Sequence, residues 1–596
     1  MNLSALNSSW QKYNVNESLV SNIKKYYDFN DLISKLISIR VSDISYVESF
    51  IRPKIKDIFP DPFHLKDMDK AVERIIQAIK NQEEICIFAD YDVDGATSGA
   101  LIINFLNYFN IKAKYYIPNR INEGYGLSNK SIDHIKNNFN SSLIITVDCG
   151  VNSFNEIDYA YENNIDVIVI DHHLSADSIP KKAIAVINPN RIDENSEYGY
   201  LCAAGVVFLF LAGIVKKIKT LNLLKELNIT SIPNIINFLD LVALGTVCDV
   251  MPVQGLNRAF ITQGIKITNN KTISNNGLRK LIEQSDIHER ISPYHLGFIL
   301  GPKINAGSRM GKQSLGIELL SELTCTTKKE IIALDLSRTN QERQAVEQII
   351  LQEAKNKIEK EGGEKKNCIV LIGNWHVGVI GIIASRIKDL YNKPAIIISS
   401  MQKENNNLSE DTLYVGSCRS ISNINIGSKI ASLKALNIIE SGGGHKAAAG
   451  FKIKKNRIKE LDDFLDREIT KDINKQPNHN IKYYDQELSI SSLNVDLVES
   501  LNILEPFGVS NPKPIFCFNN IKIFDKKLLK NKHISMFCYD NLSPSYKRVK
   551  AISFNSVGSK LADKILSNNV VNIIGTLNIN YWNDQSYIQI DIKDII

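Results

Sequence analysis

The sequence lacks the cysteine spacing of a zinc site or of a disulfide framework. Its nine cysteines are scattered along 596 residues and form no C-x-x-C pair. An odd number of cysteines without such spacing is typical of reduced thiols in a cytosolic protein. We therefore expect neither a structural zinc ion nor disulfide bonds.

A membrane-spanning run and a secretion signal are also missing. The longest stretch of low polarity, residues 201–215, is shorter than the ~20 residues that cross a bilayer, so it predicts a buried helix. Residues 1–14 do not have the charged and then apolar layout of a signal peptide. The sequence thus predicts a soluble, cytoplasmic protein with no membrane partner.

The sequence also lacks a large excess of charge of either sign. The net charge of +6 gives little indication of an anionic partner. A basic cluster in the C-terminal region fits a solvated surface as well as it fits contact with nucleic acid; it contains Lys526, Lys527, Lys530 and Lys532. The apolar fraction of 44% is that of a folded protein, and the length predicts roughly three to five domains.

Hydrophobic periodicity divides the chain into five parts. Residues 1–80 show helical spacing, whereas in residues 81–325 short runs rich in Ile and Val alternate with helical segments. This alternation predicts an α/β fold with a buried parallel sheet. Residues 326–365 predict a long connector helix ending at Gly362-Gly363. The pattern of residues 366–470 predicts a second, smaller α/β domain with a polar insert at 402–411. After a linker at 470–480, the alternation in residues 481–596 predicts a small β-barrel of the OB type.

Acidic residues or histidines follow each apolar run of the first sheet. Ligands bind beyond the carboxyl ends of parallel strands, so we expect these side chains to converge. The first three aspartates alternate along the chain, and on an extended backbone their carboxylates would share one face and repel. The residues concerned are Asp90, Asp92 and Asp94 after run 85–88, Asp148 after run 143–147, Asp171-His172-His173 after run 166–170, and Asp249 as a fourth acidic end in segment 235–250.

These residue types predict a centre for two divalent cations. Four carboxylates carry four negative charges, which two divalent ions would cancel, and one imidazole completes the set: Asp92, Asp94, Asp148, Asp249 and His172. This mixture of oxygen and nitrogen ligands suits manganese or magnesium better than zinc, because no thiolate cluster accompanies it. Two such ions can activate water and stabilise both oxygens of an in-line phosphoryl displacement. One aspartate alone would be read as a helix cap or turn residue, but the convergence of several favours a metal site.

The ordered motifs resemble the DHH phosphoesterase superfamily and, within it, the RecJ family of single-strand-specific exonucleases. The match covers roughly residues 50 to 520. Four motifs carry the superfamily resemblance: DYDVDG, VDCG (147–150), DHH (171–173) and GTVCDVMP (245–252). Six more have the RecJ character and order: YIPNRINEGYGL, NAGSRMG, GNWHVGVIGIIASR, GSCRS, SGGGHKAAAGF and EPFGVSNPKPIF. The resemblance implies a DHH domain at 81–325, a DHHA1-type substrate-binding domain at 366–470 and a nucleic-acid-binding OB-like domain at 481–596.

The resemblance also implies a role for each catalytic residue. Asp92 and Asp94 would each bind one metal ion, Asp148 would bridge both, His172 and Asp249 would complete the ligand set, and His173 would lie beside the scissile phosphate. Phe88 departs from the pattern, because many DHH enzymes have a histidine four residues before the first metal-binding aspartate. We expect Asp90 to compensate for it. Substrate phosphates would be held by Arg120, Asn305, Arg309, Ser417, Arg419, Gly443, Gly444 and His445.

The function implied is a 5′-to-3′ exonuclease that hydrolyses single-stranded DNA to 5′-mononucleotides in recombination and repair. A single-strand-binding protein and a helicase are the protein partners that the family implies, and we expect a monomer. Two alternatives stay open at this point. One is a DHH-type hydrolase of short oligoribonucleotides or cyclic dinucleotides, and the other is a scaffold that binds DNA without cleaving it.

Overall fold

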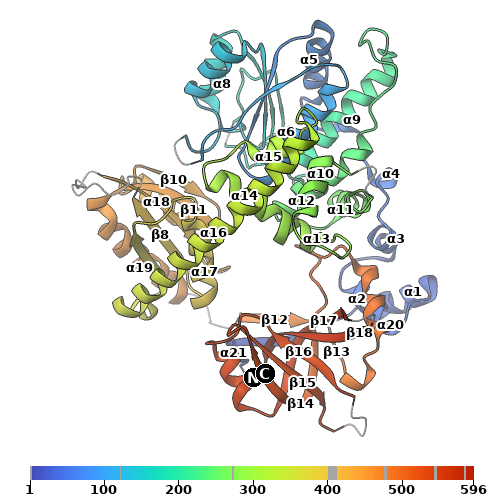
Figure 1. Cartoon of the computed structure of the whole chain (residues 1–596), viewed down its shortest axis with the longest axis vertical. Coiled ribbons are helices and arrows are strands. Elements are labelled where there is room, and N and C mark those ends of the chain that lie inside the picture. The colour runs from blue at the N-terminus through green and yellow to red at the C-terminus, as the bar shows by residue number, and fades with distance from the viewer. Residues whose placement is uncertain are drawn as a thin grey trace. The chain divides into compact units, whose positions relative to one another are not determined.

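The computed structural model describes residues 3–120, 123–176, 178–270, 274–400, 412–474, 480–542, 547–582 and 585–596 (Figure 1). They form two compact units, each assembled from segments distant in sequence. The larger unit contains residues 60–251 and 263–477, and the smaller contains residues 1–59, 252–262 and 478–596. The polar insert expected at 402–411 lies outside the described residues, as do residues 475–479 of the expected linker at 470–480; residues 470–474 are not linker, because they form the end of helix α19 (Ile458–Asn474).

The larger unit begins with the parallel sheet that the sequence predicts. Its strand order is β3-β2-β4-β5-β6, and all neighbours are parallel. The strands are β2 (Ile85–Ala89), β3 (Lys114–Tyr116), β4 (Leu143–Val147), β5 (Asp166–Ile170) and β6 (Ala185–Ile187). Every residue of β2 and β4 is buried, as expected for strands covered on both faces. The register aligns Ala89, Val147 and Ile170, so the residues that follow these strands emerge at one edge.

Helices cover both faces of this sheet. In Figure 1, α8 lies on one side of the sheet, and α5 and α9 lie on the other. The helices of this region are α5 (Met68–Asn81), α6 (Val93–Asn107), α7 (Asn129–His134), α8 (Phe154–Glu162) and α9 (Ala203–Leu221). Helix α9 contains residues 203–215 of the long apolar run and is buried over most of its length, which confirms the expectation of a buried helix. No helix among the described residues is both long and apolar enough to cross a membrane.

Two local expectations are wrong. The segment before Asp249 is helical, with a short η4 turn (Ile235–Phe238) and helix α10 (Leu239–Cys248), so Asp249 follows a helix and not a strand. The alternating aspartates do not lie on extended backbone either. Helix α6 starts at Val93, because the side chain of Asp92 caps its first turn, and this turn sends the next aspartate in another direction.

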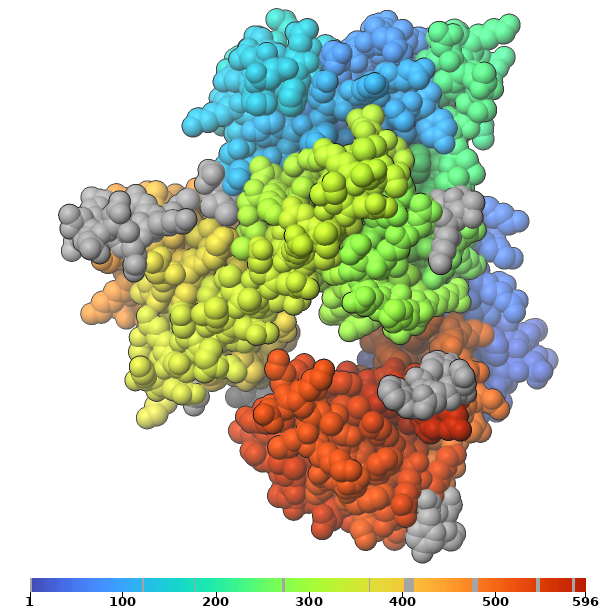
Figure 2. Space-filling view, in the orientation of Figure 1, coloured from blue at the N-terminus to red at the C-terminus, as the bar shows by residue number. Residues whose placement is uncertain are grey.

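The rest of the larger unit is a helical region, a long helix and a second sheet. Helix α11 (Gly255–Thr268) is divided between the two units, and its residues from 263 onward belong to the larger one. The other helices are α12 (Asn276–Glu283), α13 (Pro293–His295), the π-helical turn η5 (Leu296–Leu300), α14 (Gly301–Arg309), α15 (Leu315–Leu320) and α16 (Thr326–Glu361). Helix α16 is the predicted connector, and it forms a diagonal band across the visible face of this unit (Figure 2). It ends at Gly362, whose positive φ of 65° is a conformation that glycine adopts without strain.

The second sheet is mixed, with strand order β10-β11-β9-β8-β7. Only β7 and β8 are parallel; the other neighbours are antiparallel. Its strands are β7 (Ile369–Gly373), β8 (Ala395–Ser400), β9 (Leu413–Arg419), β10 (Ser441–Gly444) and β11 (Ala448–Lys454), with helices α17 (Ile380–Tyr391), α18 (Ile426–Ala435) and α19 (Ile458–Asn474). The triple glycine therefore forms a strand of a tight hairpin.

The smaller unit contains a closed five-stranded barrel. The strands follow the order β14-β15-β16-β18-β17, and pairing of β14 with β17 closes the ring. The elements are β13 (Gln486–Glu487), α20 (Val495–Ser500), β14 (Phe516–Leu529), β15 (His533–Asp540), β16 (Val549–Ser553), α21 (Lys560–Ser567), β17 (Val570–Trp582) and β18 (Gln585–Ile595). This confirms the OB-type barrel that the alternation predicts.

The N-terminal residues pack onto this barrel. They form helices α1 (Glu17–Tyr27), α2 (Asp31–Ser38), α3 (Val47–Ile51) and α4 (Ile55–Ile58), but also strand β1 (Ser8–Lys12), which pairs with β12 (Asn480–Tyr484). The guanidinium of Arg40 forms a buried ion pair with Asp485 at 2.9 Å. The helical expectation for residues 1–80 is thus incomplete, because a strand whose partner lies more than 400 residues away leaves little local signal.

Candidate metal centre and phosphate pocket

The acidic edge of the parallel sheet gathers the aspartates and histidines that the sequence singles out. Three overlapping groups have ligand atoms within 4.8 Å of one another. They are Asp90, Asp92 and Asp148; Asp94, His172 and Asp249; and Asp148, His172 and His173. Asp148 therefore belongs to two groups and lies between the first aspartates and the histidines.

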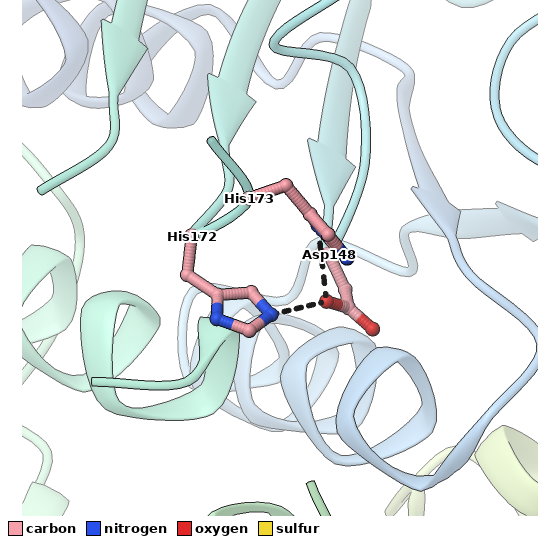
Figure 3. Close-up of side chains that lie close together, drawn as sticks. All are labelled: Asp148, His172 and His173. Atoms are coloured by element: carbon pink, nitrogen blue, oxygen red, sulfur yellow. Dashed lines mark ion pairs between the residues drawn. The ribbon is translucent and has the colours of Figure 1, made fainter. Parts of the chain in front are cut away.

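The backbone around Asp148 aims its carboxylate into this cluster. Asp148 has a positive φ of 61°, which aspartate tolerates better than most residues, and its N–H donates to the carbonyl of Ile170 at 3.1 Å. Its Oδ1 lies 3.2 Å from Nε2 of His172 and 3.9 Å from Nδ1 of His173 (Figure 3). One carboxylate thus faces both histidines of the DHH motif.

Asp92 and Asp94 are separated by the start of helix α6. Asp92 Oδ1 accepts a hydrogen bond from Gly95 N at 3.1 Å. Gly95 is required here, because a Cβ at this position would lie 2.3 Å from the carbonyl oxygen of Asp90. The carboxylate of Asp94 instead accepts hydrogen bonds from the first backbone N–H groups of helix α9, Ala203 N at 2.6 Å and Ala204 N at 2.9 Å. The positive end of that helix offsets part of its charge.

Burial and mutual repulsion raise the pKa values of these carboxylates. Burial, then the charge of Asp92, raise the pKa of Asp94 to about 7. Burial, then the charges of Asp94 and Asp92, raise that of Asp249 to about 8. The pKa values of Asp90 and Asp148 are raised well above the usual range for the same two reasons. Such a cluster of buried acids calls for a cation that compensates its charge.

The cluster fits divalent cations. Three of its buried ligand atoms have no hydrogen-bond partner among the described residues: Asp90 Oδ1, His172 Nε2 and Asp249 Oδ2. Burial, then the neighbouring His173, lower the pKa of His172 to about 4, so its imidazole is neutral at pH 7 and Nε2 can act as a ligand. Unpaired carboxylate oxygens beside a neutral imidazole form the mixed donor set that manganese and magnesium accept.

Phe88 cannot add to this set, because its ring is fully buried and stacks on Tyr116 with 5.6 Å between ring centroids. Asp90 follows the same strand and lies in the group with Asp92 and Asp148. The expectation that Asp90 compensates for the missing histidine is consistent with this position and stays a prediction.

The second histidine of the motif is held differently from the first. Nδ1 of His173 lies 2.8 Å from Oδ1 of Asp171 and 3.2 Å from the hydroxyl of Tyr125. Burial alone would lower the pKa of His173, but the hydrogen bond with Asp171 outweighs it and raises the pKa to about 9. His173 is therefore a cationic, partly exposed group beside the carboxylate cluster, suited to contact an anionic substrate.

Asp171, which has no separate role among the sequence predictions, supports both histidines of the motif. Its carboxylate is fully buried and accepts hydrogen bonds from the N–H groups of His172 at 2.8 Å, His173 at 3.2 Å and Val151 at 3.0 Å. It fixes the backbone that carries both histidines. The signal was present, since Asp171 is the first letter of the DHH motif.

A pocket of about 420 Å³ lies next to this cluster, between the helical region and the second sheet. Arg120, Arg309, Ser417 and Arg419 line it, as the resemblance implies, together with Tyr91, which lies between Asp90 and Asp92 in the chain. The guanidinium of Arg120 stacks over the ring of Tyr91 at 4.6 Å. Within the described part of the chain, none of the three arginines forms an ion pair with a carboxylate.

The pocket concentrates positive charge away from water. Burial, then the charges of Arg120, Arg343 and Arg419, lower the pKa of Arg309 to about 9, and its Nη1 donates to the carbonyl of Gly378 at 3.0 Å. Arg419 Nη1 donates to its neighbour's carbonyl, Cys418 O, at 2.8 Å and lies 3.5 Å from Ser417 Oγ. Partly buried guanidinium groups that lack carboxylate partners form a site for a phosphate or another anion.

The glycine hairpin lines the pocket, but with different residues from the three expected to bind substrate phosphates. Gly442 and Gly450 line the pocket, whereas Gly443, Gly444 and His445 are exposed and are not among its lining residues. Asn305 lies one turn before Arg309 on α14, and its buried Oδ1 has no hydrogen-bond partner among the described residues. Gly378 and Gly381 also line the pocket, and their signal was the G-x-x-G spacing after strand β7.

A parallel sheet with a DHH cluster, joined to a mixed sheet that completes an anion pocket, defines a DHH-type phosphoesterase. Residues 84–246 match the DHH family, N-terminal domain, residues 365–471 match the DHHA1 domain, and residues 484–594 match the RecJ OB domain. The chain belongs to the RecJ family. The single-stranded-DNA-specific exonuclease RecJ of Escherichia coli is 31% identical to it over 487 residues, which is 79% of this chain and 81% of that protein.

Two solved structures share this architecture. RecJ from Thermus thermophilus in complex with Mn²⁺ covers 98% of this chain and 79% of its own, with a TM-score of 0.79 and 23% identity, which shows the common fold. An exonuclease RecJ bound to manganese is 27% identical, with a TM-score of 0.57, and covers 70% of this chain and 97% of its own.

Proposed function

We propose that this chain removes 5′-mononucleotides from single-stranded DNA in the 5′-to-3′ direction, with two divalent cations in the aspartate and histidine cluster. The observation that carries the proposal is the adjacency of two sites. A cluster of buried carboxylates with unpartnered ligand atoms lies next to a pocket of arginines that have no carboxylate partner. A nucleic acid strand with a terminal phosphate is long enough, and carries enough negative charge, to occupy the metal cluster and the arginine pocket at the same time.

Two sets of ligands are available for two cations. One cation would be held by Asp90, Asp92 and Asp148, and the other by Asp94, His172 and Asp249. Asp148 would be shared, because its Oδ1 lies 3.2 Å from Nε2 of His172. When bound, two manganese or magnesium ions would supply an activated water and stabilise the negative charge that develops on the scissile phosphate. His173, held by Asp171 and Tyr125, would donate a hydrogen bond to that phosphate.

The arginine pocket would set the direction of degradation. Arg309, Ser417 and Arg419 would bind the 5′-terminal phosphate, and the unpartnered oxygen of Asn305 would accept a hydrogen bond from the same nucleotide. Fixing the end of the strand in this pocket leaves the adjacent phosphodiester at the metal centre, so each cleavage would release one nucleotide. We include Gly443, Gly444 and His445 as contacts to the substrate further out on the hairpin.

The barrel would hold the strand that has not yet been degraded. Alternate residues of β14 and β15 form an aromatic outer face, in which Phe524 packs against Phe537 and Tyr539 with ring centroids 6.0 and 5.6 Å apart. The guanidinium of Arg548 lies 5.3 Å from the ring of Phe524, and Lys522 Nζ lies 6.0 Å from that of Tyr539. Aromatic rings interleaved with cations suit single strands, because bases stack on the rings and phosphates pair with the cations.

The alternatives from the sequence have less support. A hydrolase of short oligoribonucleotides or cyclic dinucleotides would make little use of the aromatic face on the barrel. A scaffold that does not cleave would not need to keep five aspartates and two histidines within ligand distance of one another. Because all nine cysteines are free thiols, we also place the protein in the cytoplasm, where a single-strand-binding protein and a helicase would supply its substrate.

One assay tests the proposal. The protein is incubated with Mn²⁺ and single-stranded DNA, single-stranded RNA or duplex DNA, each labelled at the 5′ or the 3′ end. We expect immediate release of labelled mononucleotide from 5′-labelled single-stranded DNA, and none with EDTA. Preference for short RNA, or release first from the 3′ end, would contradict the proposal.

A further inference from the structure

The continuous helical segment that ends with Asn305 and Arg309 on α14 begins with two exposed aromatic residues, one on α13 and one in the π-helical turn η5. Tyr294 is 60% exposed and Phe298 is 73% exposed, yet their rings stack on each other with centroids 5.3 Å apart and an angle of 23° between planes. Two stacked and exposed rings offer a flat apolar surface on which a further ring, such as a nucleotide base, can stack.

The pair is held rigidly. Tyr294 packs edge-on against His295, with ring centroids 5.7 Å apart, and His295 is buried and lies 2.9 Å from Glu289 through Nε2. His295 Nδ1 also lies 2.9 Å from the hydroxyl of Ser292. The ring of Tyr294 therefore rests on a fixed support, which lowers the entropy that a ligand would lose on stacking.

The pair lies on the same helical segment as the phosphate-binding residues. This segment runs without a break through α13, the π-helical turn η5 and α14, and residues 294, 298, 305 and 309 are each exposed or partly exposed along it. Leu296, Leu300 and Ile304 of the same segment are buried. At a rise of ~1.5 Å per residue, Phe298 lies about 16 Å from Arg309 along the axis, the reach of a few nucleotides of single strand.

This segment also adjoins the metal centre. Cys248, next to Asp249, donates from Sγ to the carbonyl of Leu296 at 3.4 Å. Val250, on the other side of Asp249, is 66% exposed and has a positive φ of 61°, a strained conformation for a β-branched residue. The helical segment that connects the pocket to the aromatic pair therefore passes next to the end of α10, where Asp249 of the cluster follows.

We propose that Tyr294 and Phe298 form a stacking platform for the bases of single-stranded DNA on the 3′ side of the scissile phosphate. This rests on the proposed function, since the arginine pocket at the other end of the helical segment must hold the 5′ end of the strand. The exposed Arg290, four residues before Tyr294, adds a cation for a backbone phosphate. Stacking does not read sequence, so the platform would bind every base and would exclude a duplex, whose bases are already stacked.

The test compares the wild type with Tyr294→Ala/Phe298→Ala on 5′-phosphorylated single-stranded DNA in EDTA, by fluorescence anisotropy. A series of 12-mers carries one abasic nucleotide at each of positions 2 to 8. We expect at least one abasic position near the 5′ end to weaken binding to the wild type about 5-fold or more, and to have no further effect on the double variant. The double variant itself should bind the intact 12-mer about 5- to 50-fold more weakly. Phe298→Trp should bind at least as well as the wild type.

A matched control is Tyr108→Ala, which removes a ring that is 51% exposed at the end of α6. It should leave binding unchanged. If the double variant responds to the abasic series as the wild type does, the platform is refuted while the exonuclease proposal stands. If the wild type does not release 5′ nucleotides with Mn²⁺, the proposed function fails instead, so the two failures are distinguishable. Because both side chains are exposed, the melting temperature of the double variant should match that of the wild type.

Discussion

Oδ1 of Asp171 lies 2.8 Å from Nδ1 of His173, and this contact connects the buried core of the sheet to the exposed edge of the metal centre. The same carboxylate anchors the backbone of both histidines. We expect Asp171→Asn to lower kcat by about 10- to 100-fold, because a supporting group that orients a site residue has effects of this size. KM should change little, since the arginine pocket is intact. Steady-state kinetics on 5′-phosphorylated single-stranded DNA checks this.

A purely structural role for Asp171 would give a different result. In that case the melting temperature and KM would change together with kcat, and Mn²⁺ binding by calorimetry would be lost. Tyr125→Phe removes the other hydrogen bond to His173 and should produce a smaller loss of kcat in the same direction.

Asp148→Ala should abolish activity, because Asp148 lies in one ligand group with Asp90 and Asp92 and its Oδ1 is 3.2 Å from Nε2 of His172 in the other, which places it between the two proposed cations. The matched control is Asp158→Ala, which removes an exposed carboxylate from helix α8 and should be neutral. The rate of mononucleotide release from 5′-labelled DNA is measured for both. A variant at position 148 that keeps more than about a tenth of the wild-type rate would exclude a shared ligand; tenfold corresponds to ~1.4 kcal/mol of barrier.

Metal binding should stabilise the larger unit. The buried carboxylates repel one another without a cation, so Mn²⁺ at about 100 times its Kd should add roughly 2.7 kcal/mol to the free energy of unfolding. Thermal unfolding followed by calorimetry, with Mn²⁺ or EDTA, measures this. The stabilisation should be largely lost in Asp148→Ala and kept in Asp158→Ala; an equal shift in both variants would mean that the ion binds elsewhere.

Arg309→Ala should remove the preference for a 5′-phosphate. Its partly buried guanidinium has no carboxylate partner within the described part of the chain, and a charge-assisted hydrogen bond to phosphate contributes about 1.5–3 kcal/mol. We expect affinity for 5′-phosphorylated DNA to fall at least 10-fold, with little change for DNA that ends in a 5′-hydroxyl. Arg338→Ala, on the exposed side of α16, is the control. Equal losses for the two DNA ends would rule out the assignment.

Arg258 should be a stability determinant of the smaller unit. Its guanidinium is 2% exposed, donates to the carbonyls of Phe50, Leu504, Glu505 and Pro506, and lies 4.0 Å from the Phe50 ring. We expect Arg258→Ala to lower the free energy of unfolding by about 3 kcal/mol, because buried carbonyls lose their partner. Arg52→Ala, at an exposed position with a long 3.8 Å ion pair, should change it by less than ~0.5 kcal/mol. Urea unfolding of both variants distinguishes the two outcomes.

The sequence by itself determined the sheet, the barrel and most of the cluster. Buried parallel strands appear as continuous runs of Ile and Val, and the residues directly after them must meet at one edge, so Asp148 and His172 could be assigned without coordinates. The long helix α16 could be bounded at Gly362, since a positive φ at a helix end favours glycine.

Only the tertiary structure decided which side chains support the site. Asp94 is held by the start of a helix more than 100 residues away, Asp171 is recognised as an anchor only by its hydrogen bonds, and Asp249 follows a helix whose mostly apolar sequence resembles a buried strand. The strand β1 and the arginine pocket are likewise set by contacts between distant segments. Local periodicity reports which face of an element is buried, but it carries no information on which distant group will lie against that face.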